Sequence, residues 1–215
     1  YKRQHYKFHD IQSNHQLESN EEKLKKKTGG RKVHTTLAFV HTYPDGDRDF
    51  SFYRNPGADM MLRKEEVSLE KICASKIFHF GTLSFTHAGI RTASQYAIQC
   101  AKEAGALISF DPNLREPLWE NLEDARKAIE YGMECCDILK ISDNELTFMT
   151  GEKDYDKGAV LLQQKYQIPL VCVTLGKDGS RAYYKGLTIK SESFLQKNTI
   201  ETTGAGAVSY THLTL

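Results

Sequence analysis

The sequence predicts an α/β fold in which helices flank a parallel β-sheet. Apolar, β-branched runs that suit strands alternate with stretches whose apolar residues recur every three or four positions, as they do in amphipathic helices. Such alternation is typical of a parallel sheet covered by helices on both faces. Composition agrees with this class, because the 215 residues are 40% hydrophobic and 27% charged, as expected of a globular chain of one domain or slightly more.

The first predicted elements are two strands joined by a turn. Residues 35–40 are apolar and β-branched, a Pro-Asp-Gly turn follows at 44–46, and residues 50–53 alternate as a second strand would. We therefore expect a β-hairpin over residues 34–54. The next two elements are a helix at 64–74 and a strand at 77–80.

The rest of the chain alternates helices with strands. Residues 86–104 place Ile90, Ala93 and Ala97 at helical spacing, which predicts an amphipathic helix. The remaining predicted elements are a strand at 106–110, a helix at 121–137, a strand at 137–141, helices at 143–150 and 155–166, a strand at 170–174, and short β segments over 180–199.

Composition and charge exclude several classes of partner. No stretch approaches the ~18 consecutive apolar residues of a membrane span, and no signal segment opens the chain. The five cysteines lack metal-binding spacing, so we expect buried thiols in a reducing cytoplasm. Residues 1–33 carry nine Lys/Arg against four Asp/Glu, but without the interleaved aromatic residues that nucleic-acid binding favours. We therefore expect neither a membrane nor a nucleic acid as partner.

Polar residues follow the predicted strands, where ligands bind in sheets of this kind. Asp111, Asn113 and Arg115 bring a carboxylate, an amide and a guanidinium to one strand end, and these groups suit hydroxyls and phosphate oxygens. A helix cap with a surface ion pair is the alternative. Glu145 lies three residues after Ser142, so it either completes a capping box or holds a hydrated Mg²⁺ beside phosphates.

Three glycine-containing segments are further candidates for binding. The run Thr202-Thr203-Gly204-Ala205-Gly206 could turn backbone N–H groups inward as an anion cradle, or be a flexible turn. Residues 174–179 permit close approach of a nucleotide, or form a plain β-turn, but they are not a Walker A loop. Residues 55–59 place an amide and a carboxylate around a glycine turn, which suits sugar hydroxyls or an ordinary polar turn.

Taken in order, these motifs resemble the PfkB (ribokinase-like) family of carbohydrate kinases, and within it the bacterial fructokinases. The residues that carry the resemblance are 35–40, 54–60, 78–81, 111–115, 138–142, Glu145, 173–176 and 202–206. It covers residues 34–206 and implies a Rossmann-like parallel sheet flanked by helices, with a small β lid at about 34–54.

The resemblance implies ATP-dependent phosphorylation of a sugar hydroxyl, with fructose as the substrate, Mg²⁺ as cofactor, and room for a monovalent cation. It also implies a homodimer that pairs through its lids. The implied roles are sugar and phosphate binding for Asn55, Asp59, Asp111, Asn113 and Arg115; Mg²⁺ binding for Glu145; nucleotide binding for Thr174, Gly176 and Gly179; and an anion hole for Thr203, Gly204, Ala205 and Gly206.

The sequence departs from the family pattern at the catalytic base. The family's motif continues to an aspartate, whereas this chain has Ala207, so no residue here fills the catalytic role and we expect the chain as given to be inactive. The family's Gly-rich N-terminal strand and its later nucleotide segments are not found either. We therefore expect a kinase domain that is incomplete at both ends, preceded by an unassigned basic segment at 1–33.

The genetic code suggests an origin for the last residues. Residues 1–4 and residues 207–211 can each be encoded by codons such that the second nucleotide sequence contains the reverse complement of the first. This shared nucleotide sequence resembles a sequencing adaptor. On this hypothesis residues 207–215, and part of residues 1–33, are not native. Two alternatives for function stay open: another PfkB kinase acting on a nucleoside, ribose or a keto-deoxy sugar acid, and a non-catalytic kinase-like binding protein in which Ala207 is genuine.

Overall fold

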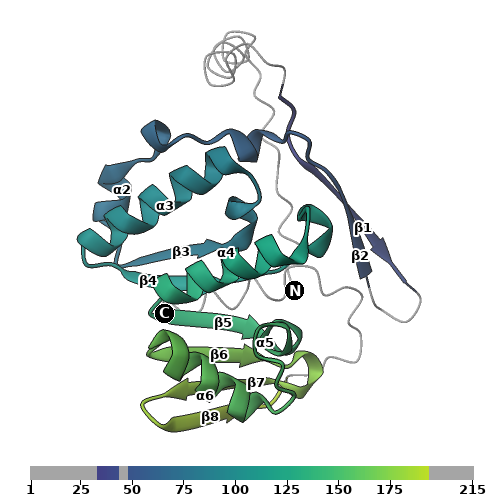
Figure 1. Ribbon diagram of the computed structural model, residues 1–215, viewed down its shortest axis with the longest axis vertical. Helices are drawn as coiled ribbons and strands as arrows, with labels where there is room; N and C mark the ends of the chain where they lie inside the picture. Colours follow the sequence, from purple (N-terminus) through teal and green to yellow (C-terminus); the bar gives the residue numbers. More distant parts are fainter. Residues whose placement is uncertain (1–32, 44–47, 194–215) are drawn as a thin grey trace, which may run out of the picture.

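The computed structural model describes residues 33–43 and 48–193. Within them, six strands form one mixed sheet in the order in which they occur along the chain (Figure 1). The first four strands are parallel to one another, and the last two are antiparallel to their neighbours. The strands are β3 (Ile77–Gly81), β4 (Leu107–Asp111), β5 (Ile138–Ser142), β6 (Leu170–Thr174), β7 (Ser180–Tyr184) and β8 (Leu187–Ser191).

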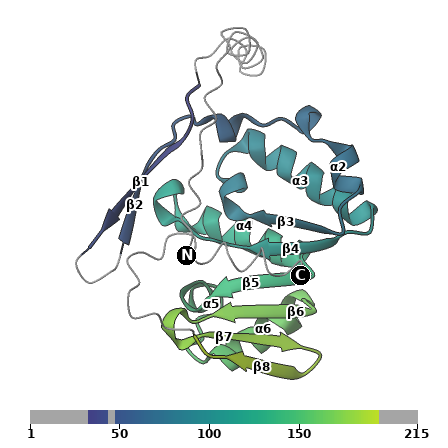
Figure 2. The same cartoon turned by 180° about the vertical axis from the view of Figure 1, so that it is seen from behind.

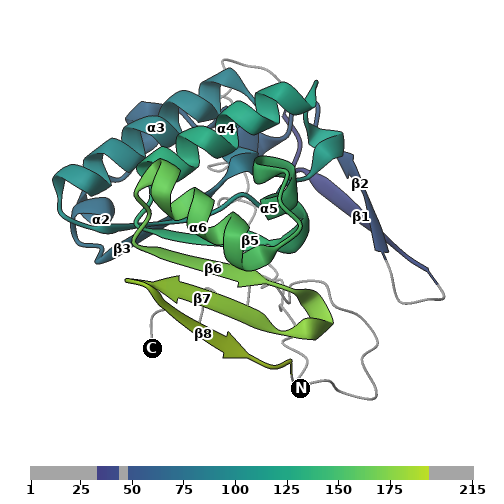
Figure 3. The ribbon, with the colours of Figure 1, turned by 60° about the horizontal axis from the view of Figure 1, so that its bottom comes forward.

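The helices that connect the parallel strands all cover the same face of the sheet (Figure 3). They are α3 (Ala88–Glu103), α4 (Leu122–Cys135), α5 (Asp143–Thr150) and α6 (Tyr155–Tyr166). Our expectation of helices on both faces was wrong for these connections. Each crossover steps to the next strand in the same direction, and because such crossovers are right-handed, every one places its helix on the same side.

The core lies between this helix layer and the sheet. On β5, Leu139 and Ile141 are fully buried beneath the helices, whereas Ile138, Lys140 and Ser142 alternate with them and are half-buried. Because successive side chains of a strand point to opposite faces, Lys140 and Ser142 lie on the face away from these helices.

The predicted helix at 64–74 is two separate elements. A 3-10 helix, η2 (Lys64–Glu66), is followed by α2 (Leu69–Cys73), and the intervening Val67 and Ser68 have extended backbone angles. The Glu66 carboxylate accepts from the Arg63 N–H (3.1 Å), which closes the first turn by itself. The break between η2 and α2 is then favoured by Val67, which is β-branched, and by Ser68, which is the N-cap residue of α2. The other 3-10 helices are η1 (Ala58–Met61), η3 (Thr82–Phe85), η4 (Glu116–Leu118) and η5 (Gly176–Asp178).

A two-stranded hairpin projects from one side of the sheet (Figures 1 and 2). Its strands are β1 (Leu37–Thr42) and β2 (Arg48–Tyr53), which pair antiparallel with Leu37 opposite Tyr53 and Val40 opposite Phe50. This confirms the hairpin expected over 34–54, although its turn lies outside the described residues. The register places Leu37, Phe39 and Tyr53 on one face and Val40 and Phe50 on the other.

The cysteines are less buried than the sequence suggested. All five are free thiols, but only Cys136 is buried and Cys73 is exposed. Burial raises the pKa of the Cys136 thiol to about 12. Across the described part of the chain, none of the helices has the length and apolar character needed to cross a membrane.

Close packing of α4 on β4 gives a stability prediction. Gly132 lies in α4 directly against Phe110, and a Cβ atom added there would sit 2.3 Å from the Phe110 Cζ. Overpacking of this kind typically costs ~1–3 kcal/mol, and replacing glycine in a helix recovers ~1 kcal/mol. We therefore expect Gly132→Ala to lower the free energy of unfolding, measured by urea denaturation, by up to about 2 kcal/mol.

The matched control is Gly89→Ala in the first turn of α3. A Cβ atom there would lie 3.5 Å from the nearest His87 ring atom, an ordinary contact, so stability should be unchanged or slightly higher. Equal stability of the two variants would show that α4 does not pack this closely on β4.

Candidate active site

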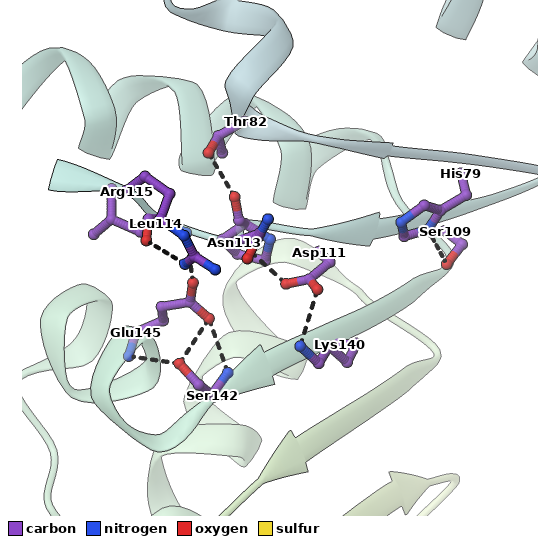
Figure 4. A network of polar contacts seen from close by, with 11 residues as sticks. His79, Thr82, Ser109, Asp111, Asn113, Leu114, Arg115, Lys140, Ser142 and Glu145 are labelled. Atoms are coloured by element: carbon purple, nitrogen blue, oxygen red, sulfur yellow. Dashed lines mark hydrogen bonds and ion pairs between the residues drawn. The ribbon is translucent and has the colours of Figure 1, made fainter. Parts of the chain in front are cut away.

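The loop that follows β4 is held by Asp111, the last residue of that strand. The Asp111 Oδ1 accepts from the Asn113 N–H (3.0 Å), and the Asp111 Oδ2 accepts from the Lys140 Nζ on β5 (2.9 Å; Figure 4). Asp111 is only 2% exposed. Asn113 has a positive φ of 45°, which non-glycine residues rarely adopt and asparagine tolerates best. Asp111 therefore fixes an unusual backbone conformation at the strand end.

Glu145 holds the next residue of the same loop. Its Oε1 accepts from the Leu114 N–H (2.7 Å), and its Oε2 accepts from the Ser142 N–H (2.9 Å) and Oγ (2.8 Å). The Ser142 Oγ in turn accepts from the Glu145 N–H (3.3 Å), which completes a capping box at the start of α5. The capping alternative is therefore confirmed, and Glu145 also ties α5 to the loop after β4. Its role toward Mg²⁺ stays a prediction.

The electrostatics of this cluster follow from burial. Burial raises the pKa of the Asp111 carboxyl above its ordinary value, the nearby Glu145 adds to this rise, and the Lys140 ammonium group opposes it. The Asp111 and Lys140 side chains are 3% and 11% exposed, so the ion pair is almost fully removed from water. A charge buried to this extent must be paired and hydrogen-bonded, as this one is.

The segment at 55–59 reaches the sheet through Arg54. The Arg54 Nε donates to the Asp59 Oδ2 (2.7 Å), its Nη1 donates to the Thr86 Oγ1 (2.8 Å), and its Nη2 donates to the Leu83 carbonyl oxygen (3.1 Å). The Thr36 hydroxyl also donates to Asp59. Asp59 is thereby brought to η3, the turn after β3, while Asn55 is exposed.

Two contacts join these parts. The Thr82 Oγ1 in η3 donates to the Pro112 carbonyl oxygen (2.5 Å), which links η3 to the loop after β4. The Arg115 guanidinium lies over the Phe50 ring, 5.4 Å from its centroid. The face of the hairpin that carries Val40 and Phe50, its inner face, therefore contacts the same loop. Asp111, Asn113, Arg115 and Glu145 thus form one cluster, with the hairpin against it.

A cavity of about 650 Å³ opens beside β3, and Asp111 and Asn113 are among the residues that line it. This volume falls within the range of small-molecule sites. Its other walls come from the segments around η2, α2, β3 and α3. The cluster after β4 therefore borders a space large enough for a small ligand.

The predicted nucleotide residues lie at the end of the neighbouring strand. Thr174 is in register with Ser142, so it sits beside the start of α5. Gly179 has φ 88°, and a Cβ atom there would lie 2.0 Å from the Ser191 carbonyl oxygen, so packing against the end of β8 already requires glycine. The β-turn alternative is therefore present, and nucleotide binding stays a prediction. Residues 203–207 lie outside the described residues.

Sequence reasoning missed the residues that hold the predicted ones. Lys140 has the clearest signal, because it is a charged residue inside an otherwise apolar strand. Arg54 lies in the segment 54–60 that carries the resemblance but was given no role of its own, and Phe50 was assigned only to a strand. Each of these residues is linked to the site by a contact between segments that are distant in the sequence. A short sequence pattern holds no information about such contacts.

Asp59 gives a pH-dependent prediction. Burial alone would raise the pKa of the Asp59 carboxyl, but hydrogen bonds from Arg54 and Thr36 outweigh it, so the pKa lies below the ordinary 3.8. Asp59→Asn should cost about 1–2 kcal/mol of unfolding free energy near neutral pH, the value of a charged hydrogen bond reduced for the partial exposure of this side chain.

The loss of unfolding free energy in Asp59→Asn should be complete above pH 3.8. It should disappear as the pH falls through the lower pKa of the folded state, because the Asp59 carboxyl of the wild type is then protonated and carries no charge either. Urea denaturation across this pH range measures it. Asp178→Asn, at an exposed turn, is the control and should show no such deficit. A deficit that persists unchanged into acid would contradict the assignment.

Comparison with known proteins identifies the family. The pfkB family carbohydrate kinase pattern matches residues 22–206. Probable fructokinase-2 of Arabidopsis thaliana is 47% identical over 172 residues, which cover 80% of this chain and 52% of that protein. The chain spans about half the length of the curated relatives it matches.

Solved structures agree with this result. The fructokinase of Xylella fastidiosa with bound ATP superposes with a TM-score of 0.70 and 29% identity, over 82% of this chain and 55% of that one. A double mutant of the Vibrio cholerae O395 fructokinase, with fructose, ADP and potassium bound, gives a TM-score of 0.70 and 28% identity, over 84% and 59%. The chain therefore belongs to the pfkB family of carbohydrate kinases.

Proposed function

We propose that the full-length protein transfers the γ-phosphoryl group of ATP to a hydroxyl of fructose and yields fructose 6-phosphate. The observation that carries this proposal is the loop from Asp111 to Arg115, held by two buried carboxylates at the carboxyl ends of β4 and β5. Membership of the family and the fructokinase names of its relatives support the choice of reaction and sugar.

The loop supplies the groups that such a reaction needs. The Asn113 amide can bind sugar hydroxyls, and the Arg115 guanidinium can bind hydroxyls or phosphate oxygens. Asn55 and Asp59 would contact the sugar from the hairpin side. In the transfer, the sugar oxygen bonds to the γ-phosphorus, the bond to the β-phosphate oxygen breaks, and ADP leaves. Catalysis then rests on positioning and on charge stabilisation.

The residues present fit a hydrated Mg²⁺ held mainly by phosphates. Glu145 already accepts three hydrogen bonds from protein donors, which leaves it lone-pair capacity for a water of a hydrated ion rather than for a full coordination role. Among the described residues there is no group of three or more His, Cys, Asp or Glu side chains that could hold a metal. When bound, the ion neutralises charge on the transferring phosphate.

Other features of the proposed site extend beyond the cluster. Thr174, Gly176 and Gly179 would border the nucleotide, and Thr203, Gly204, Ala205 and Gly206 would form the anion hole. A monovalent cation is a further candidate cofactor, supported by the potassium in the Vibrio cholerae structure. We place the reaction in the cytoplasm, because the five cysteines are free thiols.

A substrate panel tests the reaction. The full-length protein should form ADP from ATP in the presence of fructose and Mg²⁺, with fructose 6-phosphate as the product, when ADP release is followed by a coupled assay. A higher kcat/KM for a ribonucleoside, ribose or a keto-deoxy sugar acid would favour the first alternative. Sugar binding without turnover would favour a non-catalytic binding protein.

The chain as given should form no ADP in the same assay. Ala207 has no carboxylate to take the proton from the attacking hydroxyl, which an aspartate does in the family. Fructose-dependent ADP formation by these 215 residues would contradict this expectation. The residue at this position in the parent gene decides whether Ala207 is native.

We further propose that the protein forms a homodimer through the outer face of the hairpin. Leu37, Phe39 and Tyr53 lie on this face and are 50%, 55% and 57% exposed. A two-stranded hairpin is marginal in water by itself, and a cluster of exposed apolar side chains marks an interaction surface. On the opposite face, Phe50 already contacts Arg115 of the same chain.

Analytical ultracentrifugation of the full-length protein tests this interface. The wild type should sediment as a dimer, and Phe39→Glu should shift it to the monomer because it places a charge in an apolar contact. Val160→Glu on α6, at a side chain that is 42% exposed, is the control and should leave the dimer intact. A monomeric wild type would refute the proposal.

A further inference from the structure

The ion pair between Lys140 and Asp111 is costly to bury and calls for a role. Its two side chains are 11% and 3% exposed, and the Nζ and Oδ2 atoms are 2.9 Å apart. Removing two charges from water costs several kcal/mol each, and apolar residues of similar size often replace such pairs without loss of stability. Ile138, which lies two residues before Lys140 on the same face of β5, is apolar, so an apolar side chain would suit the strand itself. Stability of the sheet alone does not explain the lysine.

The pair is coupled to the loop through the second oxygen of Asp111. While the Oδ2 binds Lys140, the Oδ1 accepts from the N–H of Asn113, whose φ is 45°. The next N–H, that of Leu114, is held by Glu145. Two buried carboxylates thus fix consecutive backbone N–H groups, and this sets the direction in which Asn113 and Arg115 leave the loop (Figure 4).

Charge explains why the lysine is needed. Asp111 and Glu145 are both acidic and both buried, at 2% and 8% exposure. Burial and the charge of Glu145 raise the pKa of Asp111, and Lys140 is the group that acts most strongly against this rise. Without the ammonium group, the buried carboxylate of Asp111 would be left without its cation, so it would turn toward water and lose its bond to Asn113.

We propose that Lys140 is a positioning residue for the sugar and phosphate site, acting through Asp111 to hold the loop that presents Asn113 and Arg115. On this assignment Asp111 supports the loop and does not touch the substrate. The assignment refines the proposed function, on which its kinetic test rests.

The kinetic test uses Lys140→Met in the full-length protein. The KM for fructose should rise at least tenfold while the KM for ATP changes less than threefold, since misplacing binding groups by about 1 Å can cost ~10²-fold. Lys140→Arg keeps the charge and should stay within about threefold of the wild type in the same constants. Lys127→Met, at a side chain of α4 that is 65% exposed, is the control and should change neither.

The double variant Lys140→Met/Asp111→Asn distinguishes whether Asp111 supports the loop or contacts the substrate. It removes both charges but leaves an amide oxygen that can accept from the Asn113 N–H, so most of the lost fructose affinity should return. If Asp111 binds the substrate directly, the double variant would be at least as impaired as Lys140→Met, and the proposal would fail. An unchanged KM for fructose in Lys140→Met would also overturn it.

Amide hydrogen exchange gives a readout that does not depend on activity. In Lys140→Met the Asn113 N–H should exchange at least tenfold faster than in the wild type, and the double variant should restore its protection. Unchanged exchange would refute the positioning role. If the wild type phosphorylates no sugar, the proposed function fails, and the exchange result still decides the role of Lys140.

Discussion

Two carboxylates buried at one edge of the sheet are the constraint on which the candidate site depends. Asp111 ends β4 and Glu145 lies in the first turn of α5, and each is almost completely removed from water. A carboxylate in that position must be satisfied by hydrogen bonds or by a cation. The donors are the backbone N–H groups of the loop after β4, the N–H and hydroxyl of Ser142, and the ammonium group of Lys140. The hydrogen bonds that satisfy the two buried carboxylates therefore also fix the backbone of the loop after β4.

The parallel arrangement of the strands makes this solution possible. Strands β4, β5 and β6 run in the same direction, so Asp111, Ser142 and Thr174 all lie at their carboxyl ends. The right-handed connections keep the helices on one face, which leaves Lys140 on the other, beside Asp111 on the neighbouring strand. The hydrogen bond between them spans 29 positions in sequence, yet it needs only adjacent strands in the correct register.

The elements and the strand-end motifs could be predicted from sequence because their signals are local. Apolar periodicity located the strands and most helices, and the capping pattern of Ser142 and Glu145 was visible at its spacing of three. The helix predicted at 64–74 was broken by Val67 and Ser68, whose preferences are too weak to outweigh periodicity when seen alone. The face covered by the helices depends on strand order, and the partners of Lys140 and Arg54 depend on tertiary contacts. None of these is a property of a short window of sequence.

The hairpin shows how one small element can meet two demands. Its two strands leave both faces without a second layer of their own, and a hairpin of this size needs packing to be stable. One face obtains it from the loop after β4, through Phe50 over the Arg115 guanidinium. The other face keeps Leu37, Phe39 and Tyr53 exposed. Because adjacent residues of a strand point to opposite faces, a contact that orders the outer face also holds Phe50 in place on the inner one. A partner that packs on the outer face would therefore help to fix the position of Arg115, the residue that we propose binds the sugar or its phosphate.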